Sequence, residues 1–412
     1  MKDLFKKNII AVILNSSDIV RYQAKNKNYY DFLSLIQSDN IAAYVIDVSE
    51  LFKFKKKTFY PYSENTKKNQ FYFQPKNIIE LYKFAKKINC VALFQMPNNL
   101  GSAPIQFYLK VLGFKRFAVA TLGYLYDNSI DLSKNIKHNF LYFKNYKLHY
   151  FLFRILHIFG FVKSVDYYFE SSQKNLSKID MGISNKIFKK FNFINLSYYK
   201  KKFRINSSIY YNFLTQKLTQ SEKYIVLVDS GIDHEDVIIR EGNLSTNKRK
   251  LFYKNLFVFL KNISELYGKE VIFCQHPKIN YTIYPEFNEI KNAFKCIKFE
   301  TEKHINDSEI VLFFESSAIV NAILLKKKII NLQSNLMGPY LFKRNNLYKN
   351  EINLYQVDLN DFSLPSKKEL DFILKDRTKY YDRYIQDNIF FEKNISCYDQ
   401  IKNILNENFF KN

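Results

Sequence analysis

The sequence predicts an α/β fold with two wound domains, each built on a parallel sheet. Short apolar runs rich in β-branched residues alternate with segments of helical pattern along most of the chain. At 412 residues the chain is also too long for one core of ordinary size, and it suits two domains of about 200 residues each. Strands that alternate with helices pair in parallel, so we expect ligands beyond the carboxyl ends of the strands.

The first half of the chain contains the elements of one such domain. We expect strands at residues 9–14, 42–48, 90–95, 116–121 and 167–170, and helices at 77–87 and 103–112. Polar small residues follow two of these strands, at 15–17 and 96–102. They would suit the walls of an acceptor site, although such clusters more often form ordinary turns.

The second half restarts the pattern after a lysine-rich run at 200–208 and a polar run that continues to Glu222, which together we interpret as the interdomain connection. We predict a first domain at 1–205, a linker at 206–222, a second domain at 223–375 and C-terminal helices at 376–412. The elements expected here are strands at 224–228, 270–275, 310–314 and 328–332, helices at 248–267 and 318–325, and helical segments from 367 onward.

Composition limits the class of protein. Hydrophobic residues at 47% exclude a disordered chain, and the abundance of Phe, Tyr, Lys, Asn and Ile is typical of an AT-rich bacterial genome. The net charge of +24 favours anionic partners such as lipid headgroups, polyanions or small anionic substrates. Four widely spaced cysteines indicate neither a zinc site nor a disulfide framework, which fits a reducing cytoplasm.

No targeting or membrane-spanning segment is apparent. The apolar run at 9–14 is too short for a signal-peptide core, and Arg154 and His157 interrupt the run at 151–162. In residues 135–163 lysines alternate with aromatic residues, and this pattern suits docking on an anionic membrane surface. An ordinary amphipathic helix packed on the sheet explains the same pattern equally well, and no RNA-binding motif accompanies it. We expect a cytoplasmic protein that is soluble or peripheral on the membrane.

Three polar sites follow strands of the second domain. His276 lies at the end of the strand at 270–275, and the Ser316-Ser317 pair lies between the strand at 310–314 and a helix. Hydroxyls beside the amino end of a helix can donate to a phosphate, and a histidine at a neighbouring strand end can donate to the same group. Each feature has a plainer explanation, because serine is a common helix cap and histidine often ends a strand.

Asp229 completes this constellation. A carboxylate at the end of the strand at 224–228 would face the ligand and could accept a proton from a sugar hydroxyl. Asp233 and Asp236 compete for the same role, and the whole acidic cluster could equally be a solvated turn. Glu315 would repel a phosphate, so it would instead accept hydrogen bonds from ribose hydroxyls or face the edge of the core.

These residues carry a resemblance to a known group of enzymes. Asp229-Ser230-Gly231, Gln275-His276-Pro277 and Glu315-Ser316-Ser317 resemble, in this order, the acidic-acidic-glycine, His-Pro and Ser-Ser motifs of bacterial GT-B-type sialyltransferases and polysialyltransferases. The second half carries the likeness, and the first half matches in architecture alone. Ser230 stands where that family has a second acidic residue. The His-Pro and Ser-Ser motifs also resemble those of capsule Kdo transferases and teichoic-acid glycerophosphotransferases.

The resemblance implies a GT-B-like fold, two Rossmann-like domains that face a central cleft, with the acceptor on the first domain and the nucleotide sugar on the second. It implies inverting, metal-independent transfer, most simply of sialic acid or a related nonulosonic acid from a CMP-activated donor to capsule or lipooligosaccharide. Asp229 would be the base and His276 would assist departure of the phosphate. The donor would be held by Gln275, Pro277, Glu315, Ser316 and Ser317. No Asp-x-Asp pair is present to hold a cation, and no cofactor besides the donor is implied.

The implied partners are the nucleotide sugar, a glycan or glycolipid acceptor and the anionic inner face of the cytoplasmic membrane, with no specific nucleic acid. Transfer of Kdo or glycerophosphate in capsule synthesis is the alternative within this group. A basic nucleic-acid-binding protein and a non-catalytic GT-B scaffold protein are the alternatives outside it.

Overall fold

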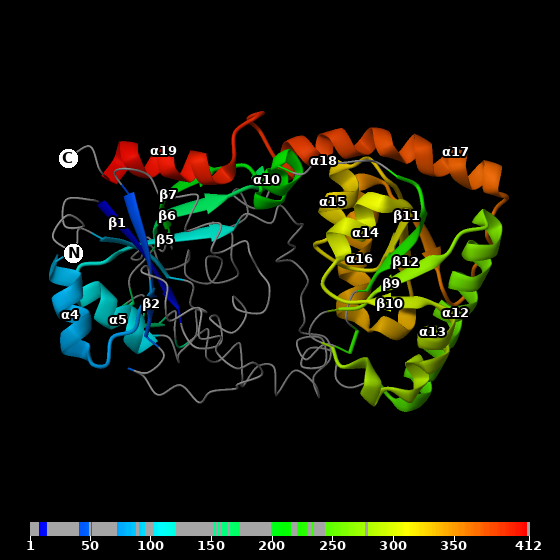
Figure 1. The fold of residues 1–412 in the computed structure, drawn as a ribbon, viewed down its shortest axis with the longest axis horizontal. Helices are drawn as coiled ribbons and strands as arrows, with labels where there is room; N and C mark the ends of the chain where they lie inside the picture. Colours follow the sequence, from blue (N-terminus) through cyan, green and yellow to red (C-terminus); the bar gives the residue numbers. More distant parts are fainter. Residues whose placement is uncertain are drawn as a thin grey trace, which may run out of the picture. The chain divides into compact units, whose positions relative to one another are not determined.

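The computed structural model describes most of the second half of the chain and selected parts of the first. The residues described are 8–14, 41–48, 51, 72–87, 90–94, 103–120, 152, 155–156, 159–162, 165–173, 199–215, 221–229, 232–233, 244–276 and 279–409. They form two compact units, each with one sheet (Figure 1). Among these residues, unit 1 contains those up to 120, those from 152 to 208 and those from 392 onward, and unit 2 contains those from 209 to 391.

Unit 1 is built on a sheet in which every neighbouring pair of strands is parallel, in the order β3-β2-β1-β4-β5-β6-β7. Its strands are Asn8–Leu14 (β1), Ile41–Asp47 (β2), Tyr72–Phe73 (β3), Cys90–Phe94 (β4), Lys115–Ala120 (β5), Val165–Glu170 (β6) and Tyr199–Arg204 (β7). Its helices are Ile78–Lys87 (α4), Ala103–Val111 (α5) and Cys397–Phe409 (α19). The five strands and two helices predicted for the first half are thus confirmed, with ends that differ by at most two residues.

The lysine-rich run at 200–208 is not simply a connection. It forms the edge strand β7 and leads into α10 (Ser208–Thr215). Lys200 Nζ lies 3.0 Å from Asp166 Oδ1 on β6, and the Lys201 ammonium lies over the Tyr167 ring. Lysines on an edge strand discourage pairing with another chain, so a charged sequence that suggests a linker can also be a strand.

Unit 2 is built on a second parallel sheet, in the order β10-β9-β8-β11-β12-β13. Its strands are Tyr224–Val228 (β8), Val271–Cys274 (β9), Lys295–Ile297 (β10), Ser308–Phe313 (β11), Lys328–Gln333 (β12) and Tyr355–Asp358 (β13). Its helices besides α10 are Thr246–Tyr267 (α12), Asn288–Ala293 (α13), Thr301–Asp307 (α14), Ile319–Leu324 (α15), Pro339–Ile352 (α16), Lys367–Arg377 (α17) and Tyr381–Asn388 (α18). Short 3-10 turns lie at Tyr281–Ile283 (η6), Pro285–Phe287 (η7), Asn335–Met337 (η8) and Thr378–Tyr380 (η9).

Both sheets are parallel, so the predicted α/β class is confirmed, and two Rossmann-like units are the components of a GT-B-like fold. The predicted cleft between the two domains stays a prediction. Within the described residues, no helix combines the length and apolar character that crossing a bilayer requires.

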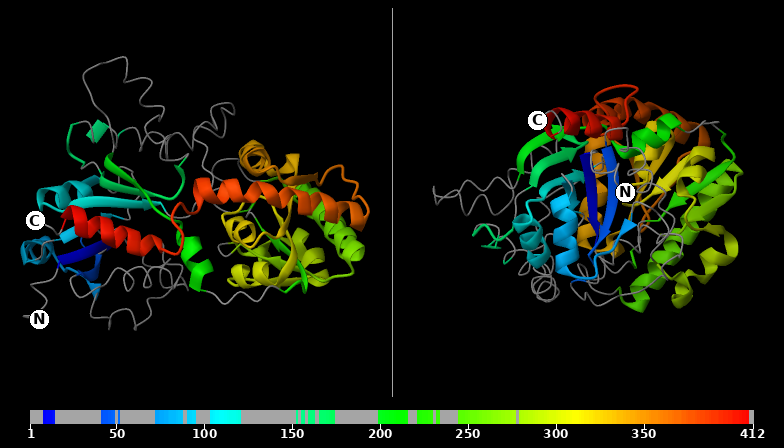
Figure 2. Two further views of the ribbon diagram at one scale, coloured as in Figure 1. Left: turned by 90° about the horizontal axis from the view of Figure 1, so that it is seen from above. Right: turned by 60° about the vertical axis from the view of Figure 1, so that its left-hand side comes forward.

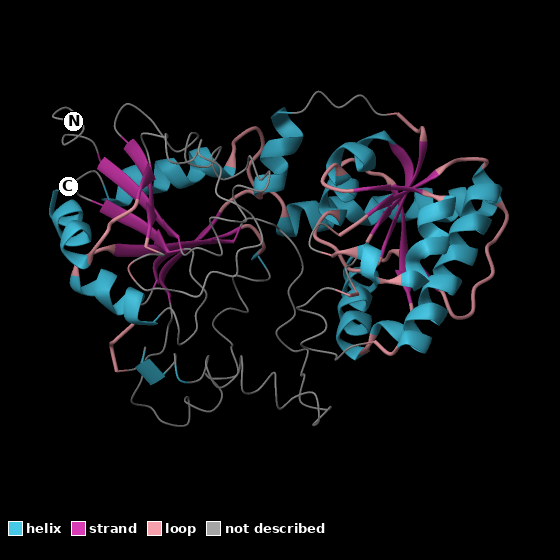
Figure 3. Ribbon diagram, turned by 60° about the horizontal axis from the view of Figure 1, so that its bottom comes forward, coloured by secondary structure: helices cyan, strands magenta, loops and turns pink. Residues whose placement is uncertain are grey.

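Alternation along the strands divides the core of unit 2 into two layers. Ile225 and Leu227 of β8 pack with α12 and α17, whereas Val226 and Val228 pack on the other face with α14, α15 and α18. Figure 3 shows helices on both faces of this sheet. Sheets covered on both faces need strands that are apolar throughout, which is why the runs at 224–228 and 310–314 could be recognised from sequence.

Helix α12 lies between β8 and β9 in the chain and has a capping residue at each end. The Ser245 hydroxyl accepts a hydrogen bond from the Lys248 backbone N–H at its start. Gly268 closes it at φ 63°, in the left-handed region that favours glycine, and its N–H donates to the Glu265 carbonyl. The chain therefore turns directly from α12 into β9.

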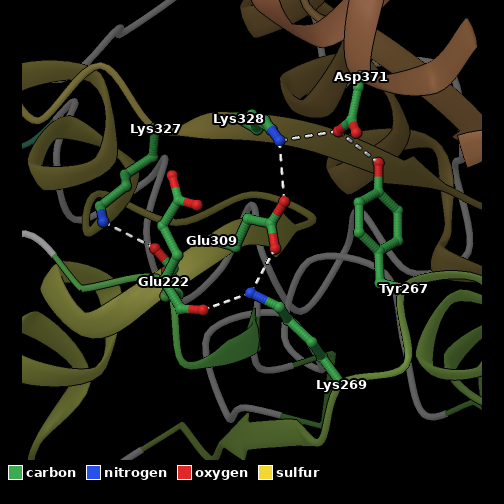
Figure 4. A network of polar contacts seen from close by, with 8 residues as sticks. Glu222, Tyr267, Lys269, Glu309, Lys327, Lys328 and Asp371 are labelled. Carbon is green, nitrogen blue, oxygen red and sulfur yellow. Dashed lines mark hydrogen bonds and ion pairs between the residues drawn. The ribbon is translucent and has the colours of Figure 1, made fainter. Parts of the chain in front are cut away.

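A network of ion pairs joins the amino ends of the central strands of unit 2 (Figure 4). Glu309 of β11 lies 2.5 Å from Lys269 Nζ and 2.9 Å from Lys328 Nζ, with only 8% of its side chain exposed. Lys328 also lies 2.8 Å from Asp371 Oδ1 of α17, which accepts a further hydrogen bond from the Tyr267 hydroxyl. Burial alone would raise the pKa of Glu309, but hydrogen bonds and charges from the two lysines outweigh it and leave that pKa below its usual range.

We expect Glu309→Gln to destabilise unit 2 by about 1 to 3 kcal/mol at neutral pH, between the values typical of surface and buried pairs. Because the folded-state pKa is lowered, the stabilisation is present above the ordinary value of 4.5 and is lost as the pH falls through the folded value. Chemical unfolding of both proteins at pH 7 and at successively lower pH should therefore show the difference shrinking below pH 4.5. Asp376→Asn, which removes the exposed pair with Lys379, is the control and should change little. A difference that grows on acidification would contradict this account.

The last helix of the chain belongs to unit 1. The buried Asn206 side chain donates to the carbonyls of Glu392 and Ile395, and the Gln400 side chain of α19 accepts from the Asn206 backbone N–H. Lys201 of β7 also lies 3.5 Å from Asn408 of α19. The predicted C-terminal segment 376–412 is therefore shared, with α18 in unit 2 and α19 in unit 1.

Candidate functional site

Three neighbouring strands of unit 2 present the predicted polar residues at one edge of the sheet. Asp229 follows β8, Gln275 and His276 follow β9, and the turn 315–317 follows β11. In the sheet β8 lies between β9 and β11, and Val228 pairs with both Cys274 and Phe313. Because all three strands are parallel, their carboxyl ends meet at the same edge. We call Asp229, His276, Ser316 and Ser317 the strand-end site.

The order of the strands differs from the expectation in one respect. His276 was predicted on a strand next to that of the serines, but β8 separates β9 from β11. Two strand spacings place these strands about 10 Å apart. A ligand that touches both His276 and the serines must therefore extend over the end of β8, where Asp229 lies.

The chain changes direction across the sheet at this same place. From β8 it continues to β9 and β10 on one side, and then returns to β11, β12 and β13 on the other. The point between β8 and β11 is a topological switch point, the position where ligands of open α/β sheets usually bind. Asp229 and the serine turn lie on its two sides.

Tyr281 links the acidic strand end to the histidine strand end. Its hydroxyl donates to Asp229 Oδ2 and accepts a hydrogen bond of 3.1 Å from the His276 backbone N–H. The ring is buried against Phe273 and Phe287. Burial and the adjacent Asp229 charge hold the pKa of Tyr281 far above its usual range, so the hydroxyl stays a donor. Asp229, itself only 7% exposed, is therefore held in one orientation.

Sequence reasoning missed Tyr281, although a signal was available. The residue lies in the short turn η6, shortly after the His-Pro pair, and it is flanked by polar residues. Its spacing from His276 is local, but its second partner is 52 positions away in the sequence. A tyrosine near a conspicuous motif becomes significant only when the sheet order is known.

Asp233, one of the two alternative bases, occupies a different environment. Arg249 Nε donates to its Oδ1 at 3.0 Å and the Tyr253 hydroxyl donates to its Oδ2 at 3.1 Å, both from α12. Its side chain is only 1% exposed. Burial raises the pKa of Asp233 despite the opposing effect of Arg249. This geometry favours a structural role, in which Asp233 anchors the segment after β8 to α12.

Glu315 is neutralised within the fold. Arg344 of α16 lies 2.5 Å from its Oε1, and both side chains are largely buried. A carboxylate beside a phosphate site would repel the anion, but an ion-paired one does so far less. The predicted contact of Glu315 with ribose hydroxyls stays a prediction, and its observed partner is Arg344.

The two serines differ in what their hydroxyls do. Ser316 Oγ accepts a hydrogen bond of 3.3 Å from the Ala318 backbone N–H, so it does serve as a cap of the turn before α15. The Ser317 hydroxyl has no hydrogen-bond partner among the residues that the structure describes, and its side chain is half-buried. Ser317 is thus the more available donor, and Ser316 can still donate its own hydroxyl proton.

A buried amide network fixes the backbone that leads into the serine turn. Asn331 of β12 donates to the Phe314 carbonyl at 3.1 Å and also contacts Asn345 of α16, which donates to the Leu332 carbonyl. Gln356 of β13 donates to Asn331 Oδ1 at 2.8 Å. Helix α16 therefore supports this turn twice, through Asn345 and through Arg344.

The remaining predicted positions carry less information. Gln275 is half-buried, and its backbone N–H donates to Ile297 of β10. Pro277, Asp236 and the predicted acceptor loops at 15–17 and 96–102 lie outside the described residues, as does most of the stretch 135–163. No group of metal-ligating side chains gathers within the described parts of the chain.

No family model matches the chain, and no curated protein matches it in sequence. Solved structures do match in arrangement. The UDP-GlcNAc 2-epimerase from Methanocaldococcus jannaschii is 14% identical with a TM-score of 0.47, covering 97% of this chain and 99% of its own. The Arabidopsis thaliana UGT89C1 complexed with UDP-L-rhamnose is 10% identical with a TM-score of 0.45, covering 98% and 99%. A variant of the wall teichoic acid polymerase TagF is 13% identical with a TM-score of 0.43, covering 98% and 89%. At these identities the matches assign no activity, so the functional argument rests on the residues.

Proposed function

We propose that this protein is an inverting glycosyltransferase that uses a nucleotide-activated sugar, with CMP-activated sialic acid or a related nonulosonic acid as the donor. The acceptor is a glycan or glycolipid of the bacterial surface, such as lipooligosaccharide or capsule, reached at the cytoplasmic face of the membrane. The observation that supports this proposal is the strand-end site. An aspartate, a histidine and two serine hydroxyls follow the carboxyl ends of three neighbouring parallel strands at a switch point.

Asp229 is suited to activate the acceptor. Tyr281 holds its Oδ2, and a carboxylate fixed in this way can accept the proton of a sugar hydroxyl. The acceptor oxygen then bonds to the anomeric carbon of the donor from the face opposite the phosphate. The bond from that carbon to the phosphate oxygen breaks, its electron pair leaves with the nucleotide, and the configuration inverts.

The departing phosphate is stabilised from both sides of β8. His276 on one side and the Ser316 and Ser317 hydroxyls on the other are donors that can be directed at the charge that develops on the leaving group. The Glu315–Arg344 pair keeps the serine side free of uncompensated negative charge. The basic background of the protein, with a net charge of +24, adds long-range attraction for an anionic donor.

A thermal-shift screen against CMP, CDP, UDP, GDP and a short RNA tests the proposal, since a ligand bound only by the native state raises the melting temperature. We expect stabilisation by CMP and its loss in His276→Ala. Preference for CDP would instead favour the glycerophosphate alternative. Stabilisation by RNA alone, falling steeply with salt, would indicate a nucleic-acid-binding protein. No response to any nucleotide would indicate a non-catalytic scaffold. Both of these last results would overturn the proposal.

A further inference from the structure

Large hydrophobic side chains gather on one surface of unit 1. Within the described residues, fifteen large hydrophobic side chains are exposed, and seven of them lie on α4, α5 and the turn 159–161. We call this surface the α4–α5 patch, and its members are Ile78, Ile79, Tyr82, Phe107, Val111, Phe159 and Phe161. Single exposed apolar residues need no explanation, but a group of this size does.

Contacts connect the three segments that carry the patch. Leu81 and Leu109, on the inner faces of α4 and α5, pack in one cluster, so the two helices lie side by side, as Figures 1 and 2 also show. The Phe107 and Phe161 rings have centroids 5.8 Å apart. The Lys110 ammonium of α5 donates to the Gly160 carbonyl, which ties the turn to the helix. The most exposed members, Phe159 at 72% and Val111 at 66%, therefore belong to segments that contact each other.

Exposed lysines lie on the same segments as these side chains. Five lysines in these segments are exposed, and they are Lys76, Lys83, Lys86, Lys110 and Lys115. Within 72–87, 103–115 and 159–162 the single acidic residue is Glu80, and its carboxylate already accepts a hydrogen bond from the Lys76 backbone N–H at the start of α4. Lys86 lies over the Tyr82 ring at 4.6 Å. The segments that carry the patch thus combine exposed apolar groups with an excess of positive charge.

We propose that the α4–α5 patch is the surface by which this protein docks on an anionic lipid bilayer. Aromatic and aliphatic side chains enter the boundary between headgroups and acyl chains, and the lysines contact the anionic headgroups. The charge complementarity favours a membrane over a second copy of the same basic chain, because two such patches would repel each other. This inference rests on the membrane partner of the proposed function and assigns it to named residues. It does not require the transfer chemistry.

Flotation with vesicles tests the assignment on the full chain. We expect binding to vesicles rich in phosphatidylglycerol, weak binding to phosphatidylcholine alone, and a decrease with rising salt. The double variant Phe159→Ser, Phe161→Ser should lower binding to the anionic vesicles by about tenfold or more. Lys83→Glu, Lys86→Glu should lower it by a similar factor, because each change reverses a charge at the headgroups.

Matched controls come from unit 2. Phe372→Ser removes a side chain that is 76% exposed on α17, and Lys250→Glu, Lys254→Glu makes the same charge change on α12. Both should bind vesicles like the unchanged protein. All the variants alter exposed side chains, and unfolding midpoints should confirm that they remain folded.

Two results would overturn the proposal. One is that the patch variants bind the anionic vesicles as strongly as the unchanged protein. The other is a concentration-dependent dimer that Phe159→Ser, Phe161→Ser abolishes while vesicle binding is absent, which would make the patch a contact between copies. The CMP thermal shift, measured in parallel, separates this inference from the proposed function. Patch-dependent vesicle binding without a CMP response would support the membrane surface and contradict the proposed donor. A CMP response without patch-dependent binding would support the donor and contradict the membrane surface.

Discussion

Replacing Asp229 by asparagine is expected to lower the rate of sugar transfer by about 10²- to 10⁴-fold, the usual contribution of a general base. The side chain keeps its shape, and Tyr281 can still donate to the remaining carbonyl oxygen, so the unfolding midpoint should change little. The rate is measured with the donor nucleotide that the thermal-shift screen identifies, under saturating donor. Donor binding should persist, because the base contacts the acceptor.

Asp233→Asn is the matched control for this experiment. It removes a charge from the buried pair with Arg249, so it should destabilise the protein by about 3 to 5 kcal/mol. Transfer by the fraction that remains folded should be near normal. The opposite pattern, with transfer lost in Asp233→Asn and kept in Asp229→Asn, would show that Asp233 is the base. Tyr281 would then not orient the catalytic carboxylate. Comparison of Tyr281→Phe with Tyr253→Phe extends the test, since each removes a buried hydroxyl that donates to one of these aspartates.

His276→Ala and the double change Ser316→Ala, Ser317→Ala are each expected to lower transfer by about 10²- to 10³-fold, the usual effect of removing donors from a developing negative charge. His276→Ala should leave the unfolding midpoint nearly intact. The double change should cost about 1 kcal/mol, because Ser316 also caps the Ala318 N–H. Single-turnover rates and CMP affinity should fall together, since both depend on contacts with the phosphate.

Ser245→Ala is the control for the serine variants. It removes a serine hydroxyl that accepts a hydrogen bond from a backbone N–H at the start of α12, so it should reduce stability by a similar amount and leave transfer unchanged. If the double serine variant and His276→Ala instead unfold early and lose activity only in proportion, these residues are a cap and a strand end, and the strand-end site loses its function.

The parts of the fold that could be predicted are those whose sequence pattern is local. Strands β8 and β11 are buried on both faces and are continuous apolar runs, so they were found within two residues of their observed ends. Strands β3, β7, β10 and β13 were missed. Strand β7 is rich in lysine. The other three are edge strands of two, three and four residues, which are too short to show a clear period.

The candidate site shows the same division. The positions of Asp229, His276 and Ser316 at strand ends could be predicted, because each follows a recognisable strand. The position of β8 between β9 and β11 could not be predicted, because the order of strands in a sheet does not follow from the pattern of any single segment. The partnerships of Tyr281 with Asp229 and of Arg344 with Glu315 were missed for the same reason. They join residues 52 and 29 positions apart.

The placement of α19 in unit 1 has a consequence for how the chain is made. Residues up to 391 already contain every described element of unit 2, whereas unit 1 lacks the partners of Asn206 until residues 392–400 have been synthesised. Unit 1 can therefore complete its set of described elements only after all of unit 2 has been synthesised. A unit made of one continuous segment, in contrast, has all its elements as soon as that segment has been synthesised, which lets amino-terminal domains fold first.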